Sequence, residues 1–448
     1  DTYNTAVGTV ALKNLSTGLL NTAVGGQAME HATTGSSNTA MGYGALNANT
    51  TGANNTAMGS AALDACTTGS NNTAIGNTAL GALTTGNNIT AVGNGAGGAV
   101  TTAASSVFMG NGAGSSVTTA NQNTIIGANA GQDLVDQSAN TFIGEEAGQN
   151  TIGEANTFIG AFAGENTNNV DHCIAIGRAA MLGVDGSTTG NNNIAIGYNS
   201  MLAITTGTEN VALGRLSLDA NTTGGNNVAV GNEALGANTT AANNTAVGYL
   251  SLGANTTGIT NTAMGSAALA ANTTANSNIA IGTDALNDNT TGALNTAVGT
   301  YALDTNTTAE RNTAIGYAAM DANTTGAYNT AVGANALDAN TTGANNSAIG
   351  YNALTANTTA SDNCAFGVAT LQANTTGTRN TGLGRGVAAV STTANDVTGV
   401  GHFVLLNNTG SQNTGGGSKS LNDNTSGDNV TAWGYNSLHA NTTGANNT

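Results

Sequence analysis

A five-residue stretch, Asn-Thr-Ala-Val-Gly at positions 4–8, returns with small edits from one end of the chain to the other. The closing glycine falls every 17 residues from Gly8 to Gly144 and again from Gly197 to Gly401, with 26 copies in all. A few steps are 16 residues, and one is 20, with its surplus around the turn-like stretch 183–191. Self-similarity at a fixed period predicts a solenoid in which every copy is one coil.

Composition excludes the common alternatives to a repeat array. Charged residues are 7%, aromatic residues 4%, and the chain has 64 glycines and no proline. An ordinary globular enzyme has roughly 25% charged residues. Disordered chains combine low hydrophobicity with high charge density, which this chain lacks.

Charge and hydropathy limit the partners. The net charge is −17, and the seven cationic residues are scattered. Without a basic patch, we expect no nucleic acid and no anionic membrane as partner. No run approaches the roughly 18 apolar residues of a membrane helix, so we expect no membrane insertion by this segment. The chain begins in mid-repeat without Met, which suggests an excerpt of a longer protein.

The consensus N-T-A-V-G-x-x-A-L-x-A-N-T-T-G-x-N holds two short apolar groups separated by turn-type residues. We interpret each coil as strand, corner, strand, corner, with the N-T-T-G run as the second corner. Neighbouring strand residues point to opposite faces. Ala6 and Val7 are both apolar, as are Ala11 and Leu12, so one face of each strand needs another chain. The pattern predicts an obligate oligomer.

A middle block exchanges bulk between two positions of the coil. Glycine replaces the usual Leu while larger residues replace the first Ala of the motif. The glycines are Gly97, Gly114, Gly131, Gly148 and Gly164, and the larger residues are Phe108, Ile125, Phe142 and Phe158. A core of constant volume predicts that these two rows share one compartment. The positions of Val7 and Ala11 would then share the opposite one.

These variations divide the array into four segments. We expect regular repeats over 1–93, the Phe and Gly variant over 94–170, regular repeats over 171–381, and irregular glycine-rich coils over 382–448. Glycine replaces Ala at Gly382, Gly399 and Gly415, which suggests an altered cross-section over 382–417.

The motif N-[TSI]-A-[VIM]-G-x-x-A resembles the head repeat of the YadA-like trimeric autotransporter adhesins, which is also found in bacteriophage tail fibres. The resemblance covers essentially the whole chain. It implies an all-β, left-handed parallel β-roll of about 26 coils, packed as a parallel trimer. The chain departs from those adhesins in its 17-residue period and its N-T-T-G corner.

Polar columns are the most regular remaining feature. Asn4, Asn21, Asn38 and Asn55 should stack coil on coil, as should the Thr pairs at 50–51, 67–68 and 84–85, and the stacked Asn side chains should form a hydrogen-bonded ladder. Threonine rows also suggest ice binding, although only one Thr of each pair would face outward. The N-x-[ST] rule marks candidate glycosylation sites at exposed corners, namely Asn49, Asn221, Asn323 and Asn441.

Enzyme chemistry is not expected. The four histidines, His31, His172, His402 and His439, are dispersed along the coils. Glu145 and Glu146 are adjacent and would point apart, whereas paired-carboxylate hydrolysis needs two groups facing one sugar. Cys66, Cys173 and Cys364 lie far apart, and we interpret them as small buried substitutes for Asn or Thr. No catalytic site, metal or cofactor is expected.

We therefore expect a structural extracellular fibre, either an adhesin or a receptor-binding fibre on a cell surface or virion. The alternative is a self-assembling filament without a specific ligand, and ice binding is a minor alternative. The expected partners are further copies of the chain, as a homotrimer and in an end-to-end filament, and a host-cell receptor or glycan.

Overall fold

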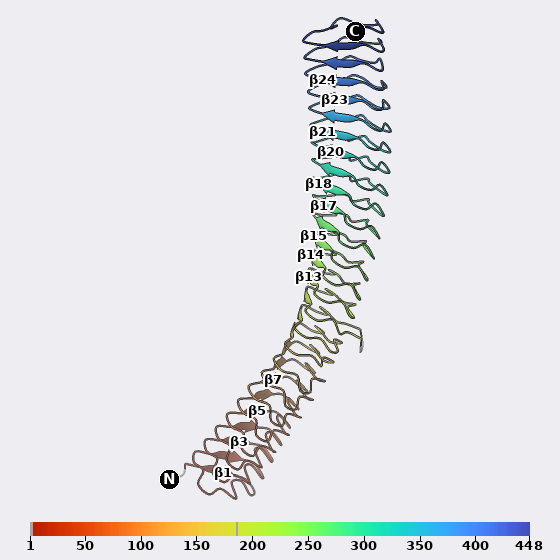
Figure 1. Cartoon of the computed structure of the whole chain (residues 1–448). Coiled ribbons are helices and arrows are strands. Elements are labelled where there is room, and N and C mark those ends of the chain that lie inside the picture. Colours follow the sequence, from red (N-terminus) through yellow and green to blue (C-terminus); the bar gives the residue numbers. More distant parts are fainter. Residues whose placement is uncertain (1–2, 185–186) are drawn as a thin grey trace. The chain divides into compact units, whose positions relative to one another are not determined.

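The computed structural model describes residues 3–184 and 187–448 and forms an all-β, parallel β-solenoid with a 17-residue repeat. Contacts divide the chain into unit 1, Asp1–Asn226, and unit 2, Asn227–Thr448. Figure 1 shows coils stacked one upon the next within each unit. The described residues contain no helix, so none of them forms a helical membrane span. Part of the expected turn at 183–191, residues 185–186, lies outside the described residues.

Each strand has three residues. The strands of unit 1 are β1 (Thr5–Val7), β2 (Thr22–Val24), β3 (Thr39–Met41), β4 (Thr56–Met58), β5 (Thr73–Ile75), β6 (Thr90–Val92), β7 (Val107–Met109), β8 (Thr124–Ile126), β9 (Thr141–Ile143), β10 (Thr157–Ile159), β11 (Ile174–Ile176), β12 (Ile194–Ile196) and β13 (Val211–Leu213). Those of unit 2 are β14 (Val228–Val230), β15 (Thr245–Val247), β16 (Thr262–Met264), β17 (Ile279–Ile281), β18 (Thr296–Val298), β19 (Thr313–Ile315), β20 (Thr330–Val332), β21 (Ser347–Ile349), β22 (Cys364–Phe366), β23 (Thr381–Leu383), β24 (Thr398–Val400), β25 (Thr414–Gly416) and β26 (Thr431–Trp433).

Successive strands within a unit pair in parallel, with like positions side by side. Thr22 lies beside Thr39 and Ala23 beside Ala40. The register survives the irregular steps, because Thr141 pairs with Thr157 across the 16-residue step and Ile174 with Ile194 across the 20-residue step. Missing and extra residues are therefore absorbed outside the strands.

The expectation of two strands in each coil is wrong. The Ala-Leu pair lies in a turn, and Leu46 and Leu63 have the left-handed φ values of 51° and 52°. Side chains alternate between faces only on an extended backbone. In this turn Ala45 and Leu46 are both fully buried.

The expected sharing of a compartment by the Val7 and Ala11 rows is wrong for the same reason. The Ala11 row is interior, as fully buried Ala28 and Ala45 show, while the Val7 row faces outward with Met41 at 42% exposure. The middle strand residue points inward, so Ala23 and Ala40 are buried. Both residues of the turn pair and one strand residue of each coil thus contribute to the apolar interior.

The exchange of bulk in the middle block is confirmed. A Cβ atom at Gly148 would lie 2.7 Å from the ring of Phe142, and one at Gly164 would overlap the ring of Phe158. The Phe142 and Phe158 rings stack at 5.1 Å between centroids. The Phe rings therefore occupy the space that Leu fills in other coils.

A second exchange of bulk occurs in the glycine-rich coils. A Cβ atom at Gly415 would lie 2.6 Å from Cγ1 of Val404, which stands where most coils have Ala. Strand register continues unchanged from β24 to β25. The closing Gly417 has a φ of 97°, against 137° at Gly25. Within 382–417 the interior packing and the corner at Gly417 therefore differ from those of the regular coils, whereas the pairing of the strands is the same.

The closing glycines form a close-packed column. Gly25 has a φ of 137°, and a Cβ atom there would lie 2.5 Å from the carbonyl oxygen of Gly42 in the next coil. Glycine is therefore required both by the backbone conformation and by the spacing of the coils.

Candidate functional site

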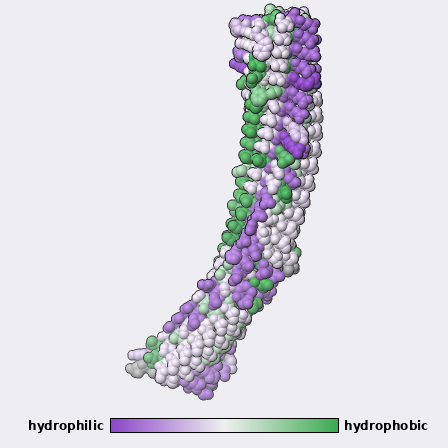
Figure 2. All heavy atoms as spheres, viewed as in Figure 1, coloured by the Kyte–Doolittle hydropathy of each residue, from purple (hydrophilic) through white to green (hydrophobic). Residues whose placement is uncertain are grey.

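In each unit, the third residue of each strand belongs to an apolar row that we call the outer stripe. Nearly every member is Val, Ile, Leu or Met. The clearly exposed members in unit 1 are Val7, Met41, Met58, Ile75, Met109 and Leu213, and in unit 2 they are Met264, Ile281, Ile315, Ile349, Leu383 and Trp433. Figure 2 shows apolar residues following one another along the edge of the upper coils. Strand alternation places these side chains outside because the buried middle residue faces in.

Tyrosines border the outer stripe. Of the nine tyrosines, six directly follow a closing glycine, and all six are exposed: Tyr43, Tyr198, Tyr249, Tyr317, Tyr351 and Tyr435. Tyrosine, Met and Trp are enriched where proteins meet other proteins. The composition of the stripe and its border is therefore typical of a contact surface.

Near the end of unit 2 one position of the outer stripe is a glycine, and a side chain of the next coil covers it. Gly416 occupies the stripe position in β25 and is buried, because the ring of Trp433 lies over it. Trp433 itself is 66% exposed. The apolar cover thus continues across a position that has no side chain.

The predicted asparagine ladder is confirmed. The backbone N–H of Asn38 donates to Oδ1 of Asn21 at 3.0 Å, and that of Asn55 donates to Oδ1 of Asn38 at 2.9 Å. Because the donor is a backbone group, a residue other than Asn can also donate this hydrogen bond. Ile89 still donates to Oδ1 of Asn72 at 3.0 Å.

A second asparagine ladder, at the N-T-T-G corner, depends on side chains at both ends of each bond. Nδ2 of Asn255 donates to Oδ1 of Asn238 at 3.1 Å, and Nδ2 of Asn272 donates to Oδ1 of Asn255 at 2.8 Å. Each amide also bonds to a carbonyl three residues on. The repeat indicated a turn here, but gave no sign that the Asn side chain faces inward.

The candidate glycosylation sites lie in this second ladder. Asn49, Asn221 and Asn323 are fully buried and Asn441 is half-buried, so the expected exposed position is wrong for the first three. Their Nδ2 groups already donate hydrogen bonds, as at Asn49 to Gly52 O, 3.0 Å. Glycosylation stays a prediction, and it would require modification before the coil closes.

The threonine columns are confirmed as stacked rows. Oγ1 of Thr50 donates to the Thr67 carbonyl at 3.1 Å, while Thr51 is exposed. Thr50 is half-buried, so Thr51 is the more exposed member of this pair. Ice binding itself stays a prediction.

Three of the four histidines have separate surroundings, and none of the three lies beside another. His31 contacts Asn47 at 3.1 Å, His439 contacts Asp423 at 3.5 Å, and His402 lies beside the ring of Phe403. No cluster of three His, Cys, Asp or Glu residues in the described ranges could hold a metal ion. That the chain is not an enzyme stays a prediction.

The cysteines occupy ladder and strand positions. Cys66 stands in the second asparagine ladder and Cys173 in the first, and burial raises the pKa of each thiol to about 11. Cys364 is half-buried at the first position of β22. The prediction of buried substitutes holds for Cys66 and Cys173.

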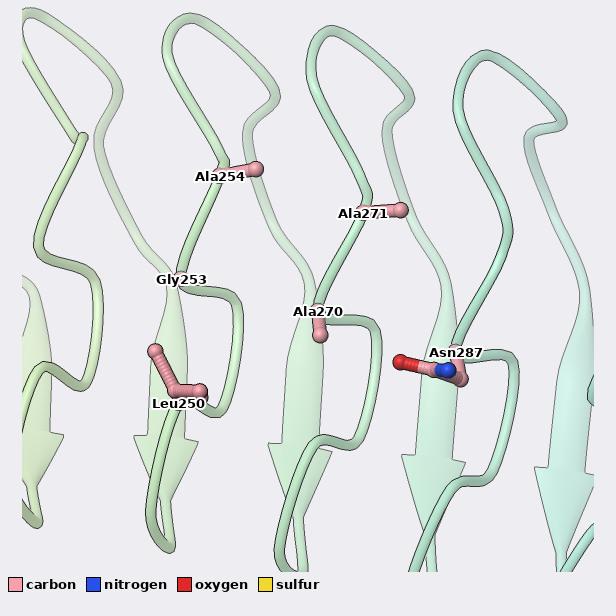
Figure 3. A pocket seen from close by; sticks show the side chains of 6 residues that line it. All are labelled: Leu250, Gly253, Ala254, Ala270, Ala271 and Asn287. Carbon is pink, nitrogen blue, oxygen red and sulfur yellow. The ribbon is translucent and has the colours of Figure 1, made fainter.

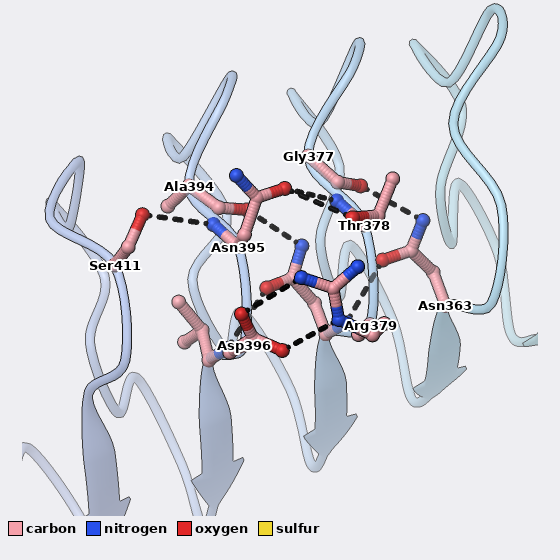
Figure 4. A network of polar contacts seen from close by, with 10 residues as sticks. Asn363, Gly377, Thr378, Arg379, Ala394, Asn395, Asp396 and Ser411 are labelled. Atoms are coloured by element: carbon pink, nitrogen blue, oxygen red, sulfur yellow. Dashed lines mark hydrogen bonds and ion pairs between the residues drawn. The ribbon is translucent and has the colours of Figure 1, made fainter.

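An exposed polar network joins neighbouring coils of unit 2 (Figure 4). Arg379 forms two bonds to Asp396, of 2.7 Å and 3.0 Å, which lower the pKa of that carboxyl. Beside it, Oδ1 of Asn395 accepts from the backbone N–H of Thr378 at 2.7 Å. The network continues the coil-to-coil bonding rather than forming a separate site.

No protein-family model matches the chain, and no curated protein sequence matches it.

Proposed function

We propose that the chain is a structural fibre protein that acts outside the cell, and that copies associate in parallel, three to a bundle, through the outer stripe. The observation that carries this proposal is the stripe itself, an uncharged apolar row repeated at one position of coil after coil.

The size of the stripe supports association. A stable protein interface buries roughly 800 Å² on each partner, and the dozen exposed Val, Ile, Leu, Met and Trp side chains of the outer stripe provide apolar area of that order. A monomer rarely leaves so long an apolar row open to water. A parallel arrangement brings like coils together, and the shared period then repeats every contact along the axis.

Analytical ultracentrifugation of the full chain tests the proposal, with a trimer as the expected species. Ile281→Asp combined with Ile315→Asp should yield monomers, because each Asp would be buried without a partner. The matched control is Thr291→Asp with Thr325→Asp at the exposed corner of the same unit, which should stay trimeric. A monomeric wild-type chain with intact β circular dichroism would overturn the proposal.

A second candidate is attachment to a receptor or glycan, and the exposed tyrosines favour it, since aromatic rings stack on sugar faces. Tyr43, Tyr249 and Tyr317 are 62%, 52% and 57% exposed. Binding of the assembled protein to immobilised glycans, lost on replacing these three tyrosines by Ser, would support attachment. Equal binding by the variant would exclude these tyrosines as the contact, and no binding by the wild-type protein would leave a filament without a specific ligand.

A further inference from the structure

Unit 2 carries a shallow hollow of about 410 Å³ that is separate from the outer stripe. Small residues line it at the positions where the following coils have Asn287 and Asp304. Its lining is Leu250, Gly253, Ala254, Ala270, Ala271 and Asn287, which come from three successive coils (Figure 3). The first five of these are apolar, so the hollow offers a seat for an aliphatic side chain.

Backbone hydrogen bonds link the coils that line the hollow to the coils that follow them in the sequence. The N–H of Ala254 donates to Ala270 O, that of Ala271 to Asn287 O, and that of Asp288 to Asp304 O. Beyond them the N–H of Thr305 donates to Asp321 O, and that of Ala322 to Asp338 O. The hollow and the three carboxylates that follow it therefore lie along one continuous row.

These carboxylates form what we call the acidic column, Asp304, Asp321 and Asp338. All three are half-buried, and Oδ1 of Asp304 is a buried atom without a hydrogen-bond partner. Desolvation raises the pKa of each, and neighbouring carboxylates add to the rise at Asp304 and Asp321.

No described cation lies against the acidic column. The ion pairs of Arg311 and Arg379 are with Glu310 and Asp396, and that of His439 is with Asp423. The groups facing Asp304 are acidic, namely Asp321, Asp288 and Asp284. Positive charge placed along this row would therefore reduce the repulsion and offset the cost of desolvating the carboxylates.

We propose that this groove docks a basic segment of a partner protein, with an aliphatic side chain in the hollow and Lys or Arg side chains along the acidic column. The two halves are matched in spacing to an extended peptide. Coils repeat at about 4.8 Å and an extended chain advances about 3.3 Å per residue, so a segment of about seven residues spans hollow and column. Charge complementarity selects this occupant over an acidic or neutral one.

The test uses a fluorescently labelled synthetic peptide with one leucine followed by lysines at three alternate positions, titrated against the full chain by anisotropy. The control peptide has glutamates in place of the lysines. We expect saturable binding of the lysine peptide only, weakened by salt. Asp321→Asn should weaken it about fivefold and the triple variant of the column more than tenfold. The matched control Asp362→Asn, an exposed carboxylate of the same unit, should leave it unchanged.

Ala271→Leu fills the hollow without changing its charge and should also weaken binding. Equal binding of the two peptides, or unchanged binding by the triple variant, would overturn the inference. So would a loss of peptide binding in the trimer with retention in the Ile281→Asp, Ile315→Asp monomer, since a second copy would then occupy the groove. The inference does not depend on the proposed assembly, because a monomeric wild-type chain that binds the lysine peptide would refute the assembly alone.

Discussion

The Oδ1 atom of Asn374 is buried without a donor because Ser391 occupies the next rung of the second asparagine ladder. Nδ2 of Asn374 continues the ladder backward to Asn357 at 3.1 Å. On the far side of the gap the ladder resumes, with Asn424 donating to Asn408 at 2.7 Å. A single residue thus separates two runs of the ladder.

Ser391→Asn should close this gap and stabilise the fold by about 1 kcal/mol, since it satisfies a buried acceptor. Chemical denaturation and hydrogen exchange around 374–408 would measure the gain. Cys66→Asn is the informative comparison. The new Asn side chain could donate a hydrogen bond to the unpaired Oδ1 of Asn49. Its own Oδ1 would face Leu83, which has no donor in its side chain, so little net gain in stability is expected. Equal effects of the two substitutions would refute the ladder explanation.

Gly25→Ala should destabilise the protein by about 3 kcal/mol, because it combines a strained φ with overlap on the Gly42 carbonyl. The adjacent Gly26→Ala is the control, since its Cβ would meet only the Tyr43 ring at 3.4 Å. Thermal unfolding of the two variants should separate clearly. Similar melting temperatures would contradict the close-packed glycine column.

Phe142 and Gly148 should show strong non-additivity. Phe142→Ala alone should cost about 4 kcal/mol through the cavity it leaves. Gly148→Leu alone should be disruptive because Leu would overlap the Phe142 ring. The double variant restores the Ala and Leu of ordinary coils, and Leu46 already adopts such a left-handed φ. Chemical denaturation of the wild type, the two single variants and the double variant gives a double-mutant cycle. Additive losses of unfolding free energy would show that the two residues do not share space.

The acidic column predicts that stability changes with pH. Burial, together with Asp321, Asp288 and Asp284, raises the pKa of Asp304 to about 6 from an unperturbed 3.8. The folded state therefore holds this proton more tightly, so stability is gained as pH falls through 6 toward 4 and lost as pH rises through the same window. We expect a contribution of about 1 kcal/mol after allowance for solvent screening.

Asp304→Asn should remove this part of the pH dependence and stabilise the protein at pH 7. Melting temperatures of variant and wild type between pH 4 and pH 8 measure it, with Asp362→Asn as the control. Parallel curves for wild type and Asp304→Asn would contradict the assignment.

The sequence predicted the coil, its period and the compensation between Phe142 and Gly148, because these follow from spacing and from conserved volume. It did not predict that Ala45 and Leu46 face the same way, since two-residue alternation assumes an extended backbone and Leu46 adopts a left-handed φ. Burial of Asn49 was missed for a related reason, because Asn is common both in exposed turns and in inward ladders. That Met41 faces outward became evident only from the structure, in which each coil has a single strand.

The first asparagine ladder has a consequence for how such a chain changes over generations. Each Asn Oδ1 in this ladder accepts a hydrogen bond from a backbone N–H of the next coil, and Ile89 donates such a bond as well as an Asn does. A duplicated or deleted block of 17 codons would join two coils whose register and bonding already fit. Unequal recombination can therefore lengthen or shorten the array while leaving the strand register and the hydrogen bonds of this ladder intact.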